Sequence, residues 1–107
     1  MSAYKVLGQV NPPANSLTTL YTVPASVSAV CSTLSVCNQA AVATTVTVAV
    51  RPAGATIDPK HYILYNAVLA ANDSLFFTIG LSLATTDVVS VSAPTTTVSF
   101  NLYGTEF

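Results

Sequence analysis

The side chains best able to do chemistry in this sequence stand in one short segment, as Asp58, Lys60 and His61. A carboxylate near an imidazole is the pair in which an acid orients a histidine that serves as a general base. Catalysis would also require a placed nucleophile and an oxyanion hole, and the sequence has no G-x-S-x-G turn. We therefore expect a solvated loop in which His61 begins a strand. A small hydrolase or lyase that uses Asp58 and His61 is the enzymatic alternative.

The other acidic residues offer a weaker case for a metal site. Asp58, Asp73 and Asp87 carry oxygen ligands suited to calcium, but their spacing fits neither an EF-hand loop nor a repeat. Asp side chains near turns commonly bond the local backbone, which is the role we expect for Asp73 and Asp87. The sequence thus predicts no metal site, no cofactor and no catalytic residue.

The two cysteines, Cys31 and Cys37, lie six residues apart in a segment that reads as one strand. Six residues of strand span roughly 20 Å, whereas a disulfide needs Cα atoms within about 7 Å. The spacing is also unlike the common zinc-binding patterns. We expect two unbridged, buried or half-buried thiols.

Tyrosines could supply a binding surface, and the candidates are Tyr21, Tyr62, Tyr65 and Tyr103. An exposed cluster of them would favour a host-surface glycan as ligand, because sugar rings stack on aromatic rings. Tyr62 and Tyr65 are three residues apart, so alternation predicts that they point to opposite faces of one strand. One of the two would then be a core residue and the other a candidate contact residue.

Hydrophobic residues recur with a period of two along nearly the whole chain, which indicates strands rather than helices. The clearest case is residues 45–51, where Val46, Val48 and Val50 share one face. Pro, Gly, Asn and Asp separate about eight such segments, at residues 4–10, 17–23, 30–37, 45–51, 61–68, 74–81, 88–92 and 96–104.

This pattern predicts an all-β protein in which about eight short antiparallel strands form a single, jelly-roll-like β-sandwich over residues 1–107. The chain is too short for two independent cores. Residues 1–15, which end near Pro12-Pro13, are either an ordinary first strand followed by a loop or an N-terminal arm that reaches a neighbour. Both interpretations remain open.

Charge is scarce in this chain of 107 residues: 7% of the residues are charged, the net charge is -1, and 51% are hydrophobic. Without a basic stripe to neutralise phosphates, we expect no nucleic-acid partner. Residues 6–50 carry no charge, but Thr, Ser, Asn and Pro interrupt every apolar run before it could span a bilayer. Residues 1–13 lack the apolar core of a signal peptide. We therefore expect no membrane association and no export.

The predicted solvent faces carry Thr and Ser rather than Lys and Glu. Free β-domains usually protect their edge strands with charge. An uncharged exterior is therefore typical of a protein whose faces are covered by neighbours in an assembly. The alternative is a soluble monomer kept apart by hydration of its hydroxyl groups.

Several longer sequence strings resemble those of a known family. They occur in the same order and cover nearly the full length of the chain. They are residues 17–25 (LTTLYTVPA), 32–38 (STLSVCN), 48–54 (VAVRPAG), 60–65 (KHYILY), 69–74 (LAANDS) and 84–91 (ATTDVVSV). Together they resemble small virion structural proteins of tailed bacteriophages, including cyanophage-type ones. These strings consist of strand and turn residues, so the resemblance concerns fold and virion class more than position on the virion.

The resemblance implies a non-enzymatic β-sandwich that serves as a capsid cement (decoration) protein or as a tail component. A cement protein would bind the major capsid protein on the capsid surface of the virion, after synthesis in the host bacterial cytoplasm. It would act by multivalent contacts and form a homo-oligomer, either a trimer or a dimer. The alternative is a tail or baseplate component, or a host-surface adhesion module.

Overall fold

A computed structural model describes residues 3–107 and shows an all-β fold, as predicted. Its strands are β1 (Tyr4–Val10), β2 (Thr18–Thr22), β3 (Ala29–Asn38), β4 (Thr44–Arg51), β5 (Tyr62–Leu69), β6 (Ser74–Leu83), β7 (Val88–Ser92) and β8 (Val98–Glu106). Two single-turn 3-10 helices, η1 (Pro52–Gly54) and η2 (Pro59–His61), join β4 to β5. Over the described range, no helix has the length and apolar character needed to cross a membrane.

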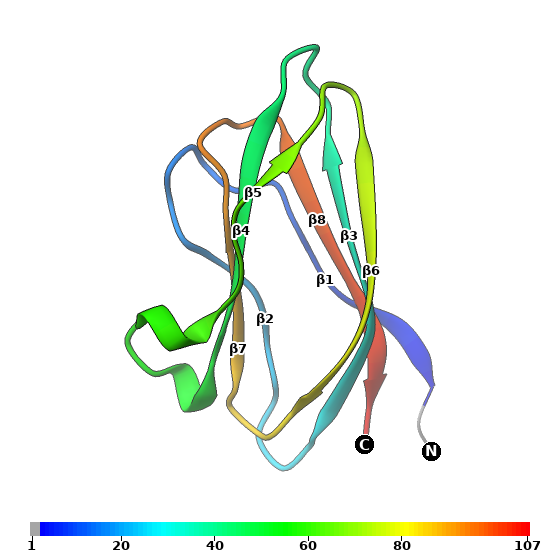
Figure 1. The fold of residues 1–107 in the computed structure, drawn as a ribbon. Helices are drawn as coiled ribbons and strands as arrows, with labels where there is room; N and C mark the ends of the chain where they lie inside the picture. The colour runs from blue at the N-terminus through cyan, green and yellow to red at the C-terminus, as the bar shows by residue number, and fades with distance from the viewer. Residues whose placement is uncertain (1–2) are drawn as a thin grey trace.

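The eight strands form two four-stranded antiparallel sheets that pack face to face, as Figure 1 shows. Their orders are β1-β8-β3-β6 and β2-β7-β4-β5. The first strand pairs with the last, the second with the seventh, the third with the sixth and the fourth with the fifth. The chain is thus one long antiparallel ribbon wrapped around a common core, which is the jelly-roll arrangement that the strand count predicted.

The core lies between the two sheets and follows the alternation in the sequence. Val46, Val48, Val89 and Val91 of one sheet face the side chains of the other, among which Phe100 is the largest that is fully buried. β-branched side chains fit a pleated, closely packed surface of this kind. The alternation therefore predicted most of the core correctly.

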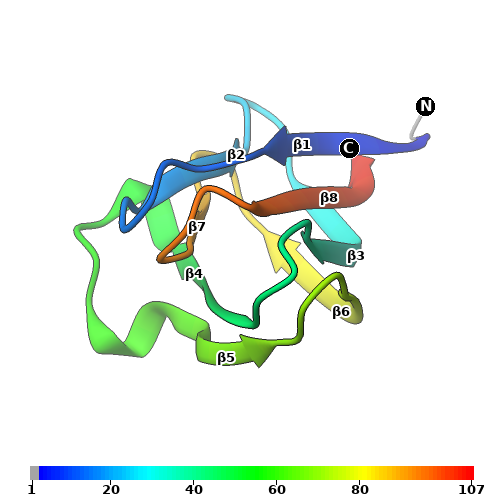
Figure 2. The ribbon, with the colours of Figure 1, turned by 90° about the horizontal axis from the view of Figure 1, so that it is seen from above.

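One side of the sandwich is closed by contact between edge strands of the two sheets. β1 passes β2 so closely at Gly8 that a Cβ on this residue would lie 2.1 Å from the carbonyl oxygen of Leu20. Figure 2 shows these two strands lying along the same side of the molecule. Only glycine fits at such an approach. β1 also pairs with β8 along its length, so residues 4–10 form a strand of the sandwich; Met1 and Ser2 lie outside the described residues.

All four edge strands contain irregular register. β1 has one extra residue between Val6 and Gly8, and β2 has one between Thr19 and Tyr21. β5 is shifted twice against β4, and β6 is shifted against β3 where Gly80 adopts a positive φ of 55°. Bulges twist a strand locally and interrupt its row of free hydrogen-bonding groups. They are therefore a way to protect an edge without charge.

A second packed layer lies outside the core, where residues 52–61 cover the outer face of the β2-β7-β4-β5 sheet (Figure 1). Ala49, Val88 and Ser90 point away from the main core and are nevertheless buried. The covering segment is attached at Asp87, whose Oδ1 accepts a hydrogen bond of 2.9 Å from the backbone N–H of Ala53. This layer supports the start of β5.

Val48→Asp is expected to abolish folding. Val48 is fully buried between Val91 and Leu64, so the substitution would place an unpaired carboxylate in the core. The cost, on the order of 5 kcal/mol, is comparable with the whole stability of a small domain, about 5–15 kcal/mol. Circular dichroism and urea denaturation would measure the effect. The control is Val68→Asp, the same change at a strand position that is 73% exposed. A cooperatively melting Val48→Asp protein would contradict the assigned core.

Candidate functional site

The Asp58–His61 segment forms a local backbone cap. The backbone N–H of Asp58 donates to Nδ1 of His61 over 3.1 Å, and the N–H of His61 donates to the carbonyl oxygen of Asp58 over 2.9 Å. The Asp58 carboxylate accepts from the N–H of Lys60. His61 is buried by these contacts and closes η2, so β5 begins one residue later than predicted. These hydrogen bonds among Asp58, Lys60 and His61 hold the loop before β5 in place.

The carboxylates of Asp73 and Asp87 accept hydrogen bonds from the backbone of turns, as the sequence predicted. Asp73 accepts from the N–H of Ser74. Asp87 uses both carboxylate oxygens, one for Ala53 and the other for the N–H of Ala84, and so ties the turn before β7 to the segment that covers the sheet. Within residues 3–107, no three His, Cys, Asp or Glu side chains gather closely enough to hold a metal ion.

The cysteines are unbridged, in agreement with the distance argument. Both lie on β3, Cys31 fully buried and Cys37 half-buried. Burial raises the pKa of the Cys31 thiol to about 11. This thiol therefore stays protonated at neutral pH and behaves as a small apolar side chain.

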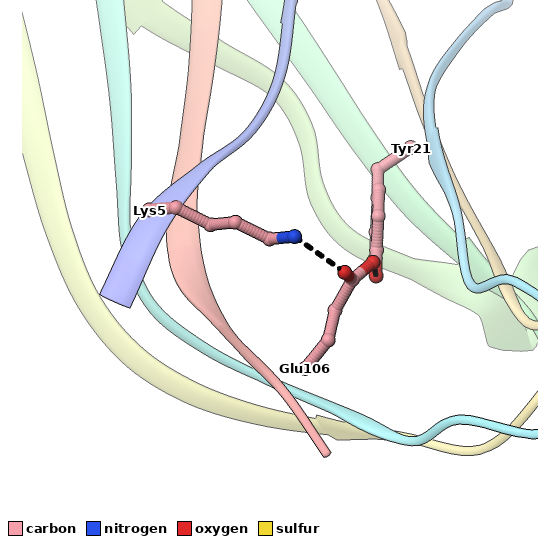
Figure 3. Close-up of polar contacts among 3 residues, drawn as sticks. All are labelled: Lys5, Tyr21 and Glu106. Carbon is pink, nitrogen blue, oxygen red and sulfur yellow. Dashed lines mark hydrogen bonds and ion pairs between the residues drawn. The ribbon is translucent and has the colours of Figure 1, made fainter. Parts of the chain in front are cut away.

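A polar cluster that contains an ion pair was not predicted from the sequence. It joins Lys5 of β1, Tyr21 of β2 and Glu106 of β8, as Figure 3 shows. Lys5 Nζ lies 2.7 Å from Glu106 Oε1, and the Tyr21 hydroxyl donates to Oε2 over 2.5 Å. The hydrogen bond from Lys5, and after it the one from Tyr21, lower the pKa of Glu106. Burial, together with the hydrogen bond to Glu106, raises the pKa of Tyr21, so its hydroxyl stays protonated and donates to Glu106.

Tyr62 and Tyr65 lie together, and the prediction that they face opposite sides of the strand is wrong. Their ring centroids are 4.8 Å apart and the ring planes meet at 66°, an edge-to-face pair. Tyr65 is 65% exposed and Tyr62 is half-buried. With Pro59 they line an open hollow of about 280 Å³. We call these three residues the tyrosine hollow.

Irregular strand pairing explains this error. Between the pairs Val48↔Leu64 and Ala49↔Tyr62, β4 advances one residue while β5 advances two. The additional residue cancels one step of the alternation, so side chains three apart share the outer face. A second shift follows at Asn66, which has a positive φ of 50° and donates its N–H to Thr47 Oγ1. The asparagine is the one signal in the sequence, since Asn tolerates this conformation.

The opposite side of the sandwich from the β1–β2 contact remains partly open. On β6, four of the five residues that face the core are only half-buried, namely Leu75, Phe77, Ile79 and Leu81. Large apolar side chains on β5 and β6 are also exposed to solvent, with Phe76 at 71% and Val68 at 73%. The two strands therefore present apolar surface and free strand edges together, without a charged side chain in either.

In comparisons with known proteins, the chain matches no family model and no curated protein.

Glu106→Gln is expected to destabilise the protein at neutral pH and to have little effect in acid. The pKa of Glu106 is lower in the folded state, so its stabilisation is present above the unfolded value of about 4.3 and is lost as pH falls through the folded pKa. Urea denaturation of both proteins between about pH 7 and about pH 2 would test this.

The matched control is Lys5→Met, which removes the main cause of the lowered pKa and should weaken the same pH dependence. If the stability difference between the original protein and Glu106→Gln stays constant over that range, the carboxylate has no such role.

Proposed function

We propose that this chain is a non-enzymatic structural protein of a tailed-bacteriophage virion, and specifically a capsid cement (decoration) protein that binds the major capsid protein. The observation that carries the proposal is the chemistry of the strand edges. Within the described chain, the four edge strands β1, β2, β5 and β6 contain a single charged residue, Lys5, and it is paired with Glu106.

Uncharged edges suit contact with many neighbours at once. A strand edge joins to another chain by backbone hydrogen bonds, and side chains on alternate positions make the joint specific. β6 offers ten residues of such an edge, with Phe76 exposed beside it. The hydroxyl and amide side chains on the outer face of the same sheet, such as Ser99 and Asn101 of β8, would make extended, hydrated contacts.

The rigid sandwich fits this use because a cement protein must transmit load between shell subunits. The fully buried core and the contact of β1 with β2 favour a scaffold that keeps its shape. Jelly rolls recur in viral capsid domains, although a fold by itself does not decide function. Placement on a symmetric shell favours a trimer or a dimer of this chain.

The second candidate is a tail or baseplate component that acts as a host-surface adhesion module. One observation favours it: the exposed edge-to-face pair of Tyr62 and Tyr65 beside an open hollow. An aromatic pair that is not used in the core is the feature that such a module requires.

The copy number of this chain per purified virion distinguishes the two candidates. Quantitative mass spectrometry against the major shell protein should give one copy per shell subunit, or a simple fraction of that number, for a cement protein. A few copies per particle would overturn the cement assignment and favour the tail.

A charge placed on the β6 edge should then prevent binding to shells that lack this protein. Thr78 is exposed on β6, and Thr78→Lys would add the charge that edge strands usually carry. The matched control is Thr96→Lys, the same change in an exposed turn. Co-sedimentation with shells should be lost for Thr78→Lys and kept for Thr96→Lys, with both variants folded by circular dichroism. Equal binding of the two would contradict a role for this edge.

A further inference from the structure

We propose that the tyrosine hollow binds the pyranose ring of a neutral saccharide. This inference deepens the second candidate function and does not depend on the capsid role. Pro59, Tyr62 and Tyr65 line the hollow, which lies where β5 begins, on the outer face of the β2-β7-β4-β5 sheet.

The ring geometry provides a stacking surface. In an edge-to-face pair, one ring presents its edge to the face of the other, so at least one further ring face stays available to a ligand. Tyr65 is 65% exposed, so its ring is accessible to a ligand. The face of an aromatic ring is electron-rich and attracts the polarised C–H groups of a pyranose. The phenol oxygen of the exposed Tyr65 is able to exchange hydrogen bonds with sugar hydroxyls.

The hollow is held in shape before any ligand binds. Pro59 is fixed in η2 by the hydrogen bonds among Asp58, Lys60 and His61. On the other side of the pair, the N–H of Asn66 donates to Thr47 Oγ1 and fixes the bulge that turns Tyr65 outward. A preformed site loses less conformational entropy when a ligand binds. This lower cost favours the binding of a small ligand such as a single sugar ring.

Size and charge select a neutral sugar over other ligands. The volume of about 280 Å³ is just below the range of typical ligand sites, about 300–1,000 Å³. It therefore suits one sugar ring better than a peptide. Pro59 is flanked by Asp58 and Lys60, whose charges have opposite signs. The rim therefore has no net charge to attract an acidic or a basic ligand.

The test is titration of the isolated protein with methyl glycosides of glucose, galactose, mannose and N-acetylglucosamine, followed by ¹⁵N chemical shifts of the β5 amides. At least one glycoside should bind and shift the amides near Tyr62 and Tyr65. Tyr65→Ala should weaken that binding by about tenfold or more, whereas Tyr65→Phe, which keeps the ring, should change it by less than about threefold. The control Tyr4→Ala removes another exposed tyrosine, on β1, and should change nothing.

Absence of binding by all four glycosides would overturn the proposal, and so would equal affinity of the original protein and Tyr65→Ala. Binding of a proline-rich peptide in place of the sugars would also overturn it. Co-sedimentation of Tyr65→Ala with shells is measured separately. If the original protein binds none of the glycosides and Tyr65→Ala loses the shell, the tyrosine pair is a contact with the capsid protein and the saccharide site is wrong, while the cement function stands.

Discussion

Strand edges with almost no charge are the constraint on which this structure depends. Proteins with open sheets commonly use lysine to stop their edges from pairing with other chains. Here Lys5 is bound to Glu106, and the other edge strands of the described chain carry no charge. Geometry takes over part of that role: each edge strand is bulged, and β1 is placed against β2 where Gly8 permits it.

The same strand irregularities shape the tyrosine hollow and the strand edges, which are the surfaces proposed to bind partners. The bulges of β5 bring Tyr62 and Tyr65 to one face, where Pro59 lines the hollow with them. The β1–β2 contact closes one side of the sandwich, whereas on the other side most of the core-facing residues of β6 are only half-buried. Under the proposed function, the open side of the sandwich is the side that would contact neighbours.

Features that depend on local alternation could be predicted from the sequence. Features that depend on contact with a strand distant in the sequence could not. Val46, Val48 and Val50 alternate because one face is buried, so the strand and its core side could be predicted. The cluster of Lys5, Tyr21 and Glu106 could not, since it depends on which strands become neighbours in the wrapped ribbon. The tyrosine pair was missed because one bulge residue reverses the alternation, and alternation alone does not show where a bulge falls.

Hydrogen–deuterium exchange of this protein, free and bound to the shell, tests most directly whether the strand edges are the contact surface. In the free protein, the outward-facing amides of β5 and β6 should exchange quickly, because they have no partner strand on that side. We expect shell binding to slow exchange along β6 and to leave the central strands β3 and β7 nearly unchanged. Unchanged exchange along all four edge strands, with protection confined to loops, would contradict it.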